Sequence, residues 1–384
     1  MQIEFLPFDS TIDPYQQQAA ELLAAYRAGD AEAIGIIKQR HPQFLDEKIP
    51  WRPKNITDET VLEAALDLAD ARLVIAREYD FRDWAALEEY AAAVAGGDPA
   101  VARFEAAVEA VIGGDVGALG GLLREDAELV RARSARVTNS DPPAHRATLL
   151  HYVAANGVEG YRQKTPPNAV AVAKMLLAGG AEADALADMY GGQYTTMSML
   201  VSSCHPAEAG VQAALVELLL DYGAAVEGVG SDAWRSPLMT ALAFGYREAA
   251  EALVRRGARV ENIAAAAGLG RIEDVRRMLG AADGVSRHRA LALAAQHGQA
   301  EVVRLLLDAG EDPNRYNPEG NHSHSTPLHQ AVWGEHEAVV RLLVERGAKL
   351  DIEDKIYQGT PLGWAIYGKK GEIEKYLLAH GAKR

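Results

Sequence analysis

Apolar residues recur with a helical period in the segment from Ser325 to Gly347, STPLHQAVWGEHEAVVRLLVERG. Thr326 is a good N-cap, and Pro327 suits a first turn, where its missing N–H costs no hydrogen bond. Apolar side chains then follow one face of each of two short helices. They are Leu328, Ala331 and Val332 in the first helix and Val339, Val340, Leu342 and Leu343 in the second. Gly334 separates the two helices and Gly347 ends the second, so the segment predicts one helix–turn–helix unit.

The same pattern recurs along the chain. The glycine that ends the second helix appears at Gly180, Gly223, Gly257, Gly310, Gly347 and Gly381. The start of the first helix recurs as TLLHYVAANG, SPLMTALAFG, STPLHQAVWG and GTPLGWAIYG. Two short amphipathic helices cannot bury their apolar faces alone, whereas stacked copies form a continuous core. The sequence therefore predicts a solenoid of repeated units.

These residues, above all Thr326, Pro327, Leu328 and His329 followed by Ala331, resemble the ankyrin-repeat family. The resemblance extends over roughly residues 100 to 384 and is specific in fold rather than in function. It implies an all-α fold, with the ankyrin-repeat domain over residues 98–384 and finger loops between repeats. It also implies that the histidine of the T-P-L-H motif, here His329, is structural.

Residues 1–97 predict helices that precede the regular repeats. A helix pair begins at Tyr15 with its turn at Gly29, and further helices are predicted over residues 60–78 and 81–95. The segment LADARLVIAREYDFRDWAALEEYA resembles a piece found ahead of the repeats in bacterial ankyrin-type proteins. Because a solenoid needs an end that faces water, we expect this region to cap the repeats.

Charge and composition restrict the class of partner and the compartment. The formal net charge of −15 argues against a nucleic-acid partner, because neutralising phosphates requires a cationic surface. The single cysteine, Cys204, excludes an internal disulfide, and we expect a buried thiol. The amino terminus lacks the pattern of a secretory signal, and no apolar run is long enough for a transmembrane helix. We therefore expect a cytoplasmic protein that does not bind a membrane.

Four loops between repeats are longer than a turn requires: residues 131–147, 182–195, 224–235 and 311–325. In ankyrin folds such loops line a concave groove together with the first helices. Aromatic residues and arginine dominate binding hot spots. The predicted groove residues are His145, Arg146, Tyr190, Tyr194, Asp232, Trp234, Arg235, Arg315, Tyr316, His322, His324, Trp333, Tyr357 and Trp364. The alternative is that these side chains only pack the fingers together.

The densest polar cluster is NHSHSTPLH, which contains His322, His324 and His329. If the finger is extended, His322 and His324 point to one side, where they suit a metal ligand pair or acid–base groups. Two histidines without further ligands do not complete a metal site. The chain also lacks a nucleophile elbow, a dinucleotide fingerprint and a complete phosphate-binding loop. We therefore expect no metal, cofactor or catalytic residue.

Two functions remain open at this point. The favoured one is a non-catalytic protein whose groove and fingers bind a protein or peptide. The alternative is a small-molecule-binding protein or enzyme, in which the fingers and the insertion GVEGYRQKTPPN close a pocket over the groove. His322 and His324 would then be its acid–base groups. The second function requires the finger residues to line one closed pocket, whereas the first function does not.

Overall fold

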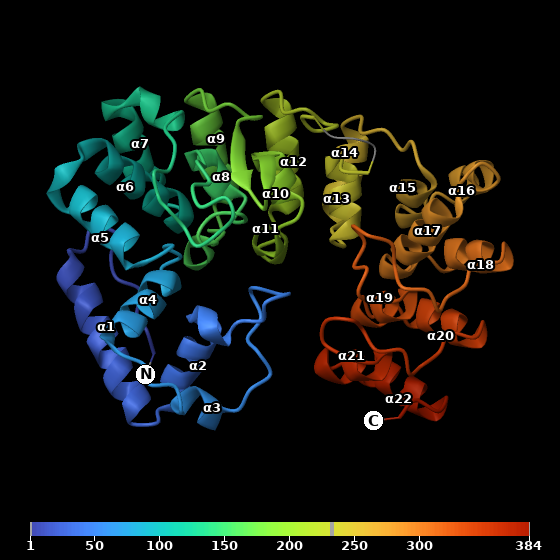
Figure 1. Cartoon of the computed structure of the whole chain (residues 1–384). Helices are drawn as coiled ribbons and strands as arrows, with labels where there is room; N and C mark the ends of the chain where they lie inside the picture. The colour runs from blue at the N-terminus through green and yellow to red at the C-terminus, as the bar shows by residue number, and fades with distance from the viewer. Residues whose placement is uncertain (1, 231–233, 384) are drawn as a thin grey trace. The chain divides into compact units, whose positions relative to one another are not determined.

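The computed structural model describes residues 2–230 and 234–383, and it divides into two compact units (Figure 1). Unit 1 contains residues 1–218 and unit 2 contains residues 219–384. The division falls within helix α12 (Gln212–Asp221). The predicted boundary at residue 97 lies inside unit 1 and stays a prediction.

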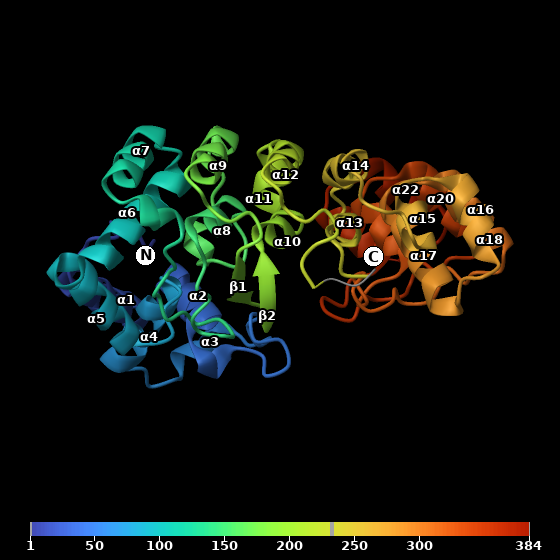
Figure 2. The same cartoon turned by 90° about the horizontal axis from the view of Figure 1, so that it is seen from above.

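Unit 1 begins with helices that precede the repeats: α1 (Ile12–Arg27), α2 (Ala31–Arg40), α3 (Asp58–Leu62), α4 (Leu68–Glu78) and α5 (Trp84–Ala92). The repeats start with α6 (Pro99–Gly113) and α7 (Val116–Glu125), followed by α8 (Leu149–Val153), α9 (Ala169–Ala178), α10 (Thr196–Leu200) and α11 (Cys204–Glu208). Figure 2 shows α6 beside α7 and α8 beside α9, as the repeat pattern predicts. The core of the helices before the repeats includes Tyr15, Leu22, Ile75 and Leu87.

Unit 2 has two layers of antiparallel helices. The first helices of its repeats are α13 (Pro237–Ala243), α15 (Ile263–Gly268), α17 (Gly284–Gln296), α19 (Pro327–Trp333) and α21 (Pro361–Tyr367). The second helices are α14 (Arg247–Arg255), α16 (Ile272–Leu279), α18 (Ala300–Asp308), α20 (Glu337–Glu345) and α22 (Gly371–Ala379). Each first helix from α13 to α21 contacts the next first helix, and α16, α18, α20 and α22 follow one another in the same way. One apolar cluster runs from Ile263 to Ala382, so neighbouring repeats share a continuous core.

The helix predicted over residues 60–78 is wrong, because the structure has two helices there. α3 ends at Leu62, and α4 begins after Asp67. Asp67 caps α4, accepting hydrogen bonds from the Ala69 and Asp70 backbone N–H groups, while the Asp70 side chain accepts one from the Asp67 N–H. This capping box starts a new helix within a stretch whose apolar spacing is otherwise continuous.

One finger contains a β-hairpin that the sequence pattern did not predict. Strand β1 (Leu186–Met189) pairs antiparallel with β2 (Gly192–Thr195), with Leu186 opposite Thr195. The two-residue turn has left-handed backbone at Tyr190 and Gly191, as such turns require. The hairpin leads directly into α10.

Within the described residues, no helix is both long and apolar enough to cross a membrane.

Candidate functional site

Six aromatic or imidazole rings form a connected cluster in unit 2, which we call the aromatic surface: Phe244, His322, His324, Trp333, Tyr357 and Trp364. Ring centroids are 6.4 Å apart for Phe244 and His322 and 6.1 Å for His322 and His324. His324 lies 6.3 Å from Tyr357 and 5.8 Å from Trp364, and Trp364 lies 5.9 Å from Trp333. Trp333 and Trp364 lie on the first helices α19 and α21, and Phe244 directly follows α13. The other three rings lie on two fingers.

Much of the aromatic surface is open to solvent. Phe244 is 50% exposed, Trp333 52% and Tyr357 69%. Trp364 is held more firmly, because its indole Nε1 donates a hydrogen bond to Asp354 Oδ2 at 3.0 Å. The sequence predicted Trp333, Tyr357 and Trp364 as groove residues, and the structure brings them together with His322 and His324. Phe244 was not predicted as a groove residue, because it follows α13 in a segment whose apolar pattern is typical of the buried core.

The His322 side chain connects the finger that precedes α19 to the end of α13, which is the first helix three repeats earlier. Its Nε2 lies 2.9 Å from the carbonyl oxygen of Ala243, which also accepts a hydrogen bond from Gln296 Nε2. His322 adopts a left-handed backbone conformation, with φ of 54°. Burial lowers the pKa of His322, although the Ala243 carbonyl opposes this shift. The side chain is therefore a neutral hydrogen-bond donor at neutral pH.

His324, two residues after His322 in the same finger, lies over a buried carboxylate. Its Nδ1 is 3.5 Å from Asp354 Oδ1. Asp354 is 1% exposed and accepts backbone hydrogen bonds from Ile356, Tyr357 and Gly359. Asp354 thus shapes the last finger and holds Trp364 in place.

His329 makes the hydrogen bonds of a structural residue. Its Nδ1 accepts from the Thr326 backbone N–H at 3.3 Å and lies 2.9 Å from Thr326 Oγ1, while Nε2 donates to the Gly359 carbonyl at 3.1 Å. Pro327 occupies the first turn of α19 and Leu328 is buried. His151 in unit 1 has the same arrangement, with Thr148 and the Tyr194 carbonyl. The motif therefore joins α8 and α19 to the fingers that follow them.

The other predicted groove residues in unit 2 lie on the fingers but outside the ring cluster. Arg289 lies over the Trp234 ring at 4.9 Å, and Lys355 lies over the Tyr316 ring at 4.1 Å. Arg315 is exposed, with Nη1 3.8 Å from Glu311 Oε2, and Arg235 is also exposed. Asp232 falls outside the described residues.

The predicted groove residues in unit 1 do not form a comparable surface. Tyr190 is 63% exposed at the hairpin turn, where its hydroxyl donates to Asn156 Oδ1 at 2.7 Å. Tyr194 is half-buried in β2, and Arg146 is exposed with a left-handed φ of 53°. His145 differs most from expectation, because it is 2% exposed and lies inside the unit.

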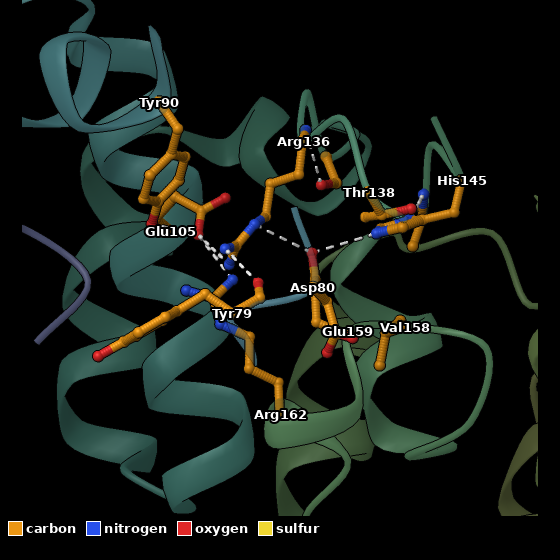
Figure 3. A network of polar contacts seen from close by, with 12 residues as sticks. Tyr79, Asp80, Tyr90, Glu105, Arg136, Thr138, His145, Val158, Glu159 and Arg162 are labelled. Carbon is orange, nitrogen blue, oxygen red and sulfur yellow. Dashed lines mark hydrogen bonds and ion pairs between the residues drawn. The ribbon is translucent and has the colours of Figure 1, made fainter. Parts of the chain in front are cut away.

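His145 belongs to a buried network of charged side chains, shown in Figure 3. The network consists of Glu105, Arg136, His145, Glu159 and Arg162, all of which are at least 97% buried. Arg136 Nε lies 3.3 Å from Glu159 Oε1, and His145 Nε2 approaches the same oxygen at 3.2 Å. Arg162 Nη1 lies 2.7 Å from Glu105 Oε2. The two arginines and the two glutamates therefore compensate one another's charge inside the unit.

The network joins segments that are far apart in sequence. Glu105 lies on α6, Arg136 and His145 on the long connection, and Glu159 and Arg162 on the insertion at residues 157–168. Arg136 also lies over the rings of Phe81 and Tyr90, at 4.2 and 4.6 Å, and donates to the Tyr79 carbonyl. The network therefore connects the helices before the repeats to the first repeats, across the predicted boundary at residue 97.

Neighbouring charges keep the network ionised. Burial alone would raise the pKa of Glu159, but Arg136 and His145 outweigh it and lower that pKa. Burial alone would lower the pKa of Arg162, but Glu105 and its other neighbours hold it well above the usual value. Sequence reasoning missed this network. The only signal was the presence of Arg136, Glu159 and Arg162 in two unusually long loops.

Cys204 is exposed at the start of α11, so the expected buried thiol is wrong. The apolar residues near Cys204 in the sequence belong to α10 and α12. Cys204 itself lies on the surface, at the start of α11. Within residues 2–230 and 234–383, no three His, Cys, Asp or Glu side chains are grouped so that they could hold a metal ion.

Comparison with known proteins supports the repeat assignment. The family model described as ankyrin repeats (3 copies) matches residues 262–354. The chain is 29% identical over 219 residues to the ankyrin repeat and KH domain-containing protein mask-1 of Caenorhabditis elegans, covering 55% of this chain and 8% of that protein. It is 39% identical over 89 residues to the mouse ankyrin repeat and SAM domain-containing protein 6, covering 23% of this chain and 10% of that protein. The chain thus spans a tenth or less of these relatives.

Among solved structures, the ankyrin repeat domain of human ASB11 matches with 21% identity and a TM-score of 0.30. That match covers 62% of this chain and the whole of the ASB11 chain.

Proposed function

The chain is an ankyrin-repeat protein, and we propose that it is a non-catalytic binding protein whose aromatic surface recognises a protein or peptide. Ankyrin repeats are generally protein–protein interaction modules. The proposal assigns that activity in this chain to the ring cluster on the first helices and fingers of unit 2.

One observation carries the proposal: three large rings that are half or more exposed lie in one connected cluster. Phe244, Trp333 and Tyr357 are linked through His322, His324 and Trp364. Exposed apolar groups that are gathered in one place, rather than scattered, are typical of interaction sites. Tryptophan and tyrosine are also the residues most enriched among binding hot spots.

The cluster is also fixed in advance of binding. Trp364 is held by Asp354, His322 by the Ala243 carbonyl, and His329 ties α19 to the last finger. Rings that are already ordered lose little conformational entropy when a partner binds. These contacts therefore favour tight recognition at a preformed surface.

The acid–base alternative for His322 and His324 has less support. His322 is committed to a main-chain carbonyl, and His324 lies over a carboxylate that also organises the last finger. The two best-defined pockets in the described part of the chain are not lined by these histidines. A general base needs a free ring nitrogen directed at substrate.

A comparative capture experiment tests the proposal. The wild-type chain, the double variant Trp333→Ala/Tyr357→Ala and the control Trp51→Ala are immobilised and exposed to lysate of the source organism. Trp51 is a suitable control because it is 76% exposed and belongs to unit 1. We expect at least one protein to be retained by the wild type and the control but lost from the double variant. Retention that is equal on all three baits contradicts the proposal.

A further inference from the structure

A pocket of about 240 Å³ lies in unit 1, at the edge of the buried network. Its walls come from the segment before α1, from α1, α5 and α6, and from the insertion at residues 157–168. Nothing in the predicted groove of unit 2 contributes to it. An apolar protein cavity of about 150 Å³ is large enough to hold benzene, so this pocket is large enough for one substituted ring.

Five of the eleven residues that line the pocket are aromatic. Phe5 stacks on Tyr161 with ring centroids 4.8 Å apart and an interplanar angle of 13°. Tyr90 forms another wall and fixes the segment before α1, because its hydroxyl donates to the Phe8 carbonyl at 3.2 Å. The Leu6 backbone N–H donates to Tyr79 Oη at 2.9 Å. These contacts give a ring-shaped ligand ordered aromatic faces to pack against.

One polar group in the pocket has no partner. Tyr15 is 2% exposed, yet its hydroxyl makes no hydrogen bond to any described residue. The hydroxyl is not sealed from solvent either, so it opens into the pocket whose wall it forms. Burial raises the pKa of Tyr15 above its usual value, and the hydroxyl therefore remains a proton donor. Because no described residue accepts this hydrogen bond, an acceptor on a ligand in the pocket can take it.

The charges at the pocket favour an anion. Arg162 and Lys164 line it together with a single carboxylate, Glu109. Glu109 Oε1 lies 3.1 Å from Arg162 Nη2, and Arg162 is fully buried. The Arg162 nitrogens are sealed from solvent and paired with Glu105 and Glu109, so Arg162 can act on a ligand only through its charge. Lys164 is exposed and makes no ion pair within the described residues.

We propose that this pocket binds a small aromatic carboxylate with a single ring. The ring packs against the walls formed by Phe5, Tyr90 and Tyr161. The carboxylate accepts a hydrogen bond from the Tyr15 hydroxyl and is attracted by Lys164 and Arg162. This site is independent of the binding surface proposed for unit 2.

The test is titration of the full chain with benzoate, followed by NMR or calorimetry. Benzyl alcohol and benzylamine serve as neutral and cationic probes of the same size. We expect benzoate to bind more tightly than both. Tyr15→Phe should weaken benzoate binding by roughly ten- to hundredfold, the effect of one lost hydrogen bond to a charged acceptor. Lys164→Gln should weaken it by about two- to fivefold, as expected for an exposed charge.

Two control variants locate the effect. Lys174→Gln removes another exposed lysine, on α9, and Trp333→Ala changes the aromatic surface of unit 2; both should bind benzoate as the wild type does. Tyr15→Phe should not lower the free energy of unfolding, since the lost hydroxyl has no partner. The inference is overturned if benzoate binds no better than benzyl alcohol, or if Tyr15→Phe and Lys164→Gln bind it with unchanged affinity.

Discussion

The indole rings of Trp333 and Trp364 meet edge to face, with centroids 5.9 Å apart and an interplanar angle of 77°. They come from equivalent first helices, α19 and α21, in consecutive repeats. Only Trp364 has a hydrogen-bonded anchor, Asp354, whereas Trp333 is half exposed. Trp364 thus maintains the shape of the aromatic surface, whereas Trp333 is available to a partner.

This difference predicts separate effects of two substitutions. Trp333→Ala should change the free energy of unfolding by less than about 0.5 kcal/mol while weakening partner binding, because its ring is largely solvated. Trp364→Ala should reduce both binding and stability, the latter by about 2 kcal/mol, because it leaves a cavity and removes one hydrogen bond to the buried Asp354. Urea denaturation of the two variants checks the stability part. Equal destabilisation by both would show that the rings have the same role.

The buried network predicts a large cost for removing one charge. Glu159→Gln should destabilise unit 1 by about 3 kcal/mol, because it leaves Arg136 and His145 without their shared carboxylate. Glu128→Gln is the matched control, since Glu128 is 78% exposed in its pair with Arg131 and should change stability by less than about 0.5 kcal/mol. Denaturant unfolding measures both. A loss of less than about 1 kcal/mol in Glu159→Gln contradicts the structural role of the network.

The two motif histidines predict a pH dependence of stability. Burial lowers the pKa of both His151 and His329 to about 4, from an unfolded value of about 6.5. Between these values the unfolded chain binds protons that the native chain does not. The stability is therefore fully present above about pH 6.5 and falls as the pH is lowered toward about 4, by roughly 1–3 kcal/mol per histidine.

The double variant His151→Asn/His329→Asn isolates this effect. Asparagine retains an acceptor near the position of Nδ1 but does not titrate, so the variant should be less stable at pH 7 and lose less stability between pH 6.5 and 5. Urea midpoints measured at several pH values provide the comparison. If the urea midpoints of the variant and the wild type changed with pH in parallel, these histidines would be excluded as the source of the pH dependence of stability.

Two glycines have similar backbone conformations, but their replacement by alanine should lower the free energy of unfolding by different amounts. Gly298 has a φ of 71°, and a Cβ there would lie 2.6 Å from His336 Nδ1. Gly310 has a φ of 90° and nothing within 4 Å of such a Cβ. Gly310→Ala should therefore cost about 1 kcal/mol from backbone strain alone. Gly298→Ala should cost at least about 1 kcal/mol more, as measured by denaturant unfolding, and equal losses would rule out the steric contribution.

Sequence reasoning predicted the repeats well because their information is local. The Thr326-Pro327 helix start, the apolar spacing and Gly347 specify one unit without knowledge of the rest of the chain. The cluster of His322, His324, Trp333 and Trp364 was also predicted in part, because the family fold places fingers and first helices side by side.

The remaining features depend on contacts between distant residues. Phe244 joins His322 only when repeats stack, and Arg136 meets Glu159 only when two loops fold into the same interior. His145 was expected at the surface, since a histidine in a long loop carries no sequence signal of burial. The break before α4 depends on Asp67 and Asp70 forming a capping box within an uninterrupted apolar pattern.

The most direct test of the proposed binding surface is site-specific photo-crosslinking in the source organism. A benzophenone amino acid replaces Trp333 in one chain and Trp51 in another, because both positions are exposed and tolerate a large ring. The account predicts that the chain labelled at residue 333 forms a discrete covalent adduct with a protein, and that the chain labelled at residue 51 does not. The same adducts from both positions, or none from residue 333, would contradict it.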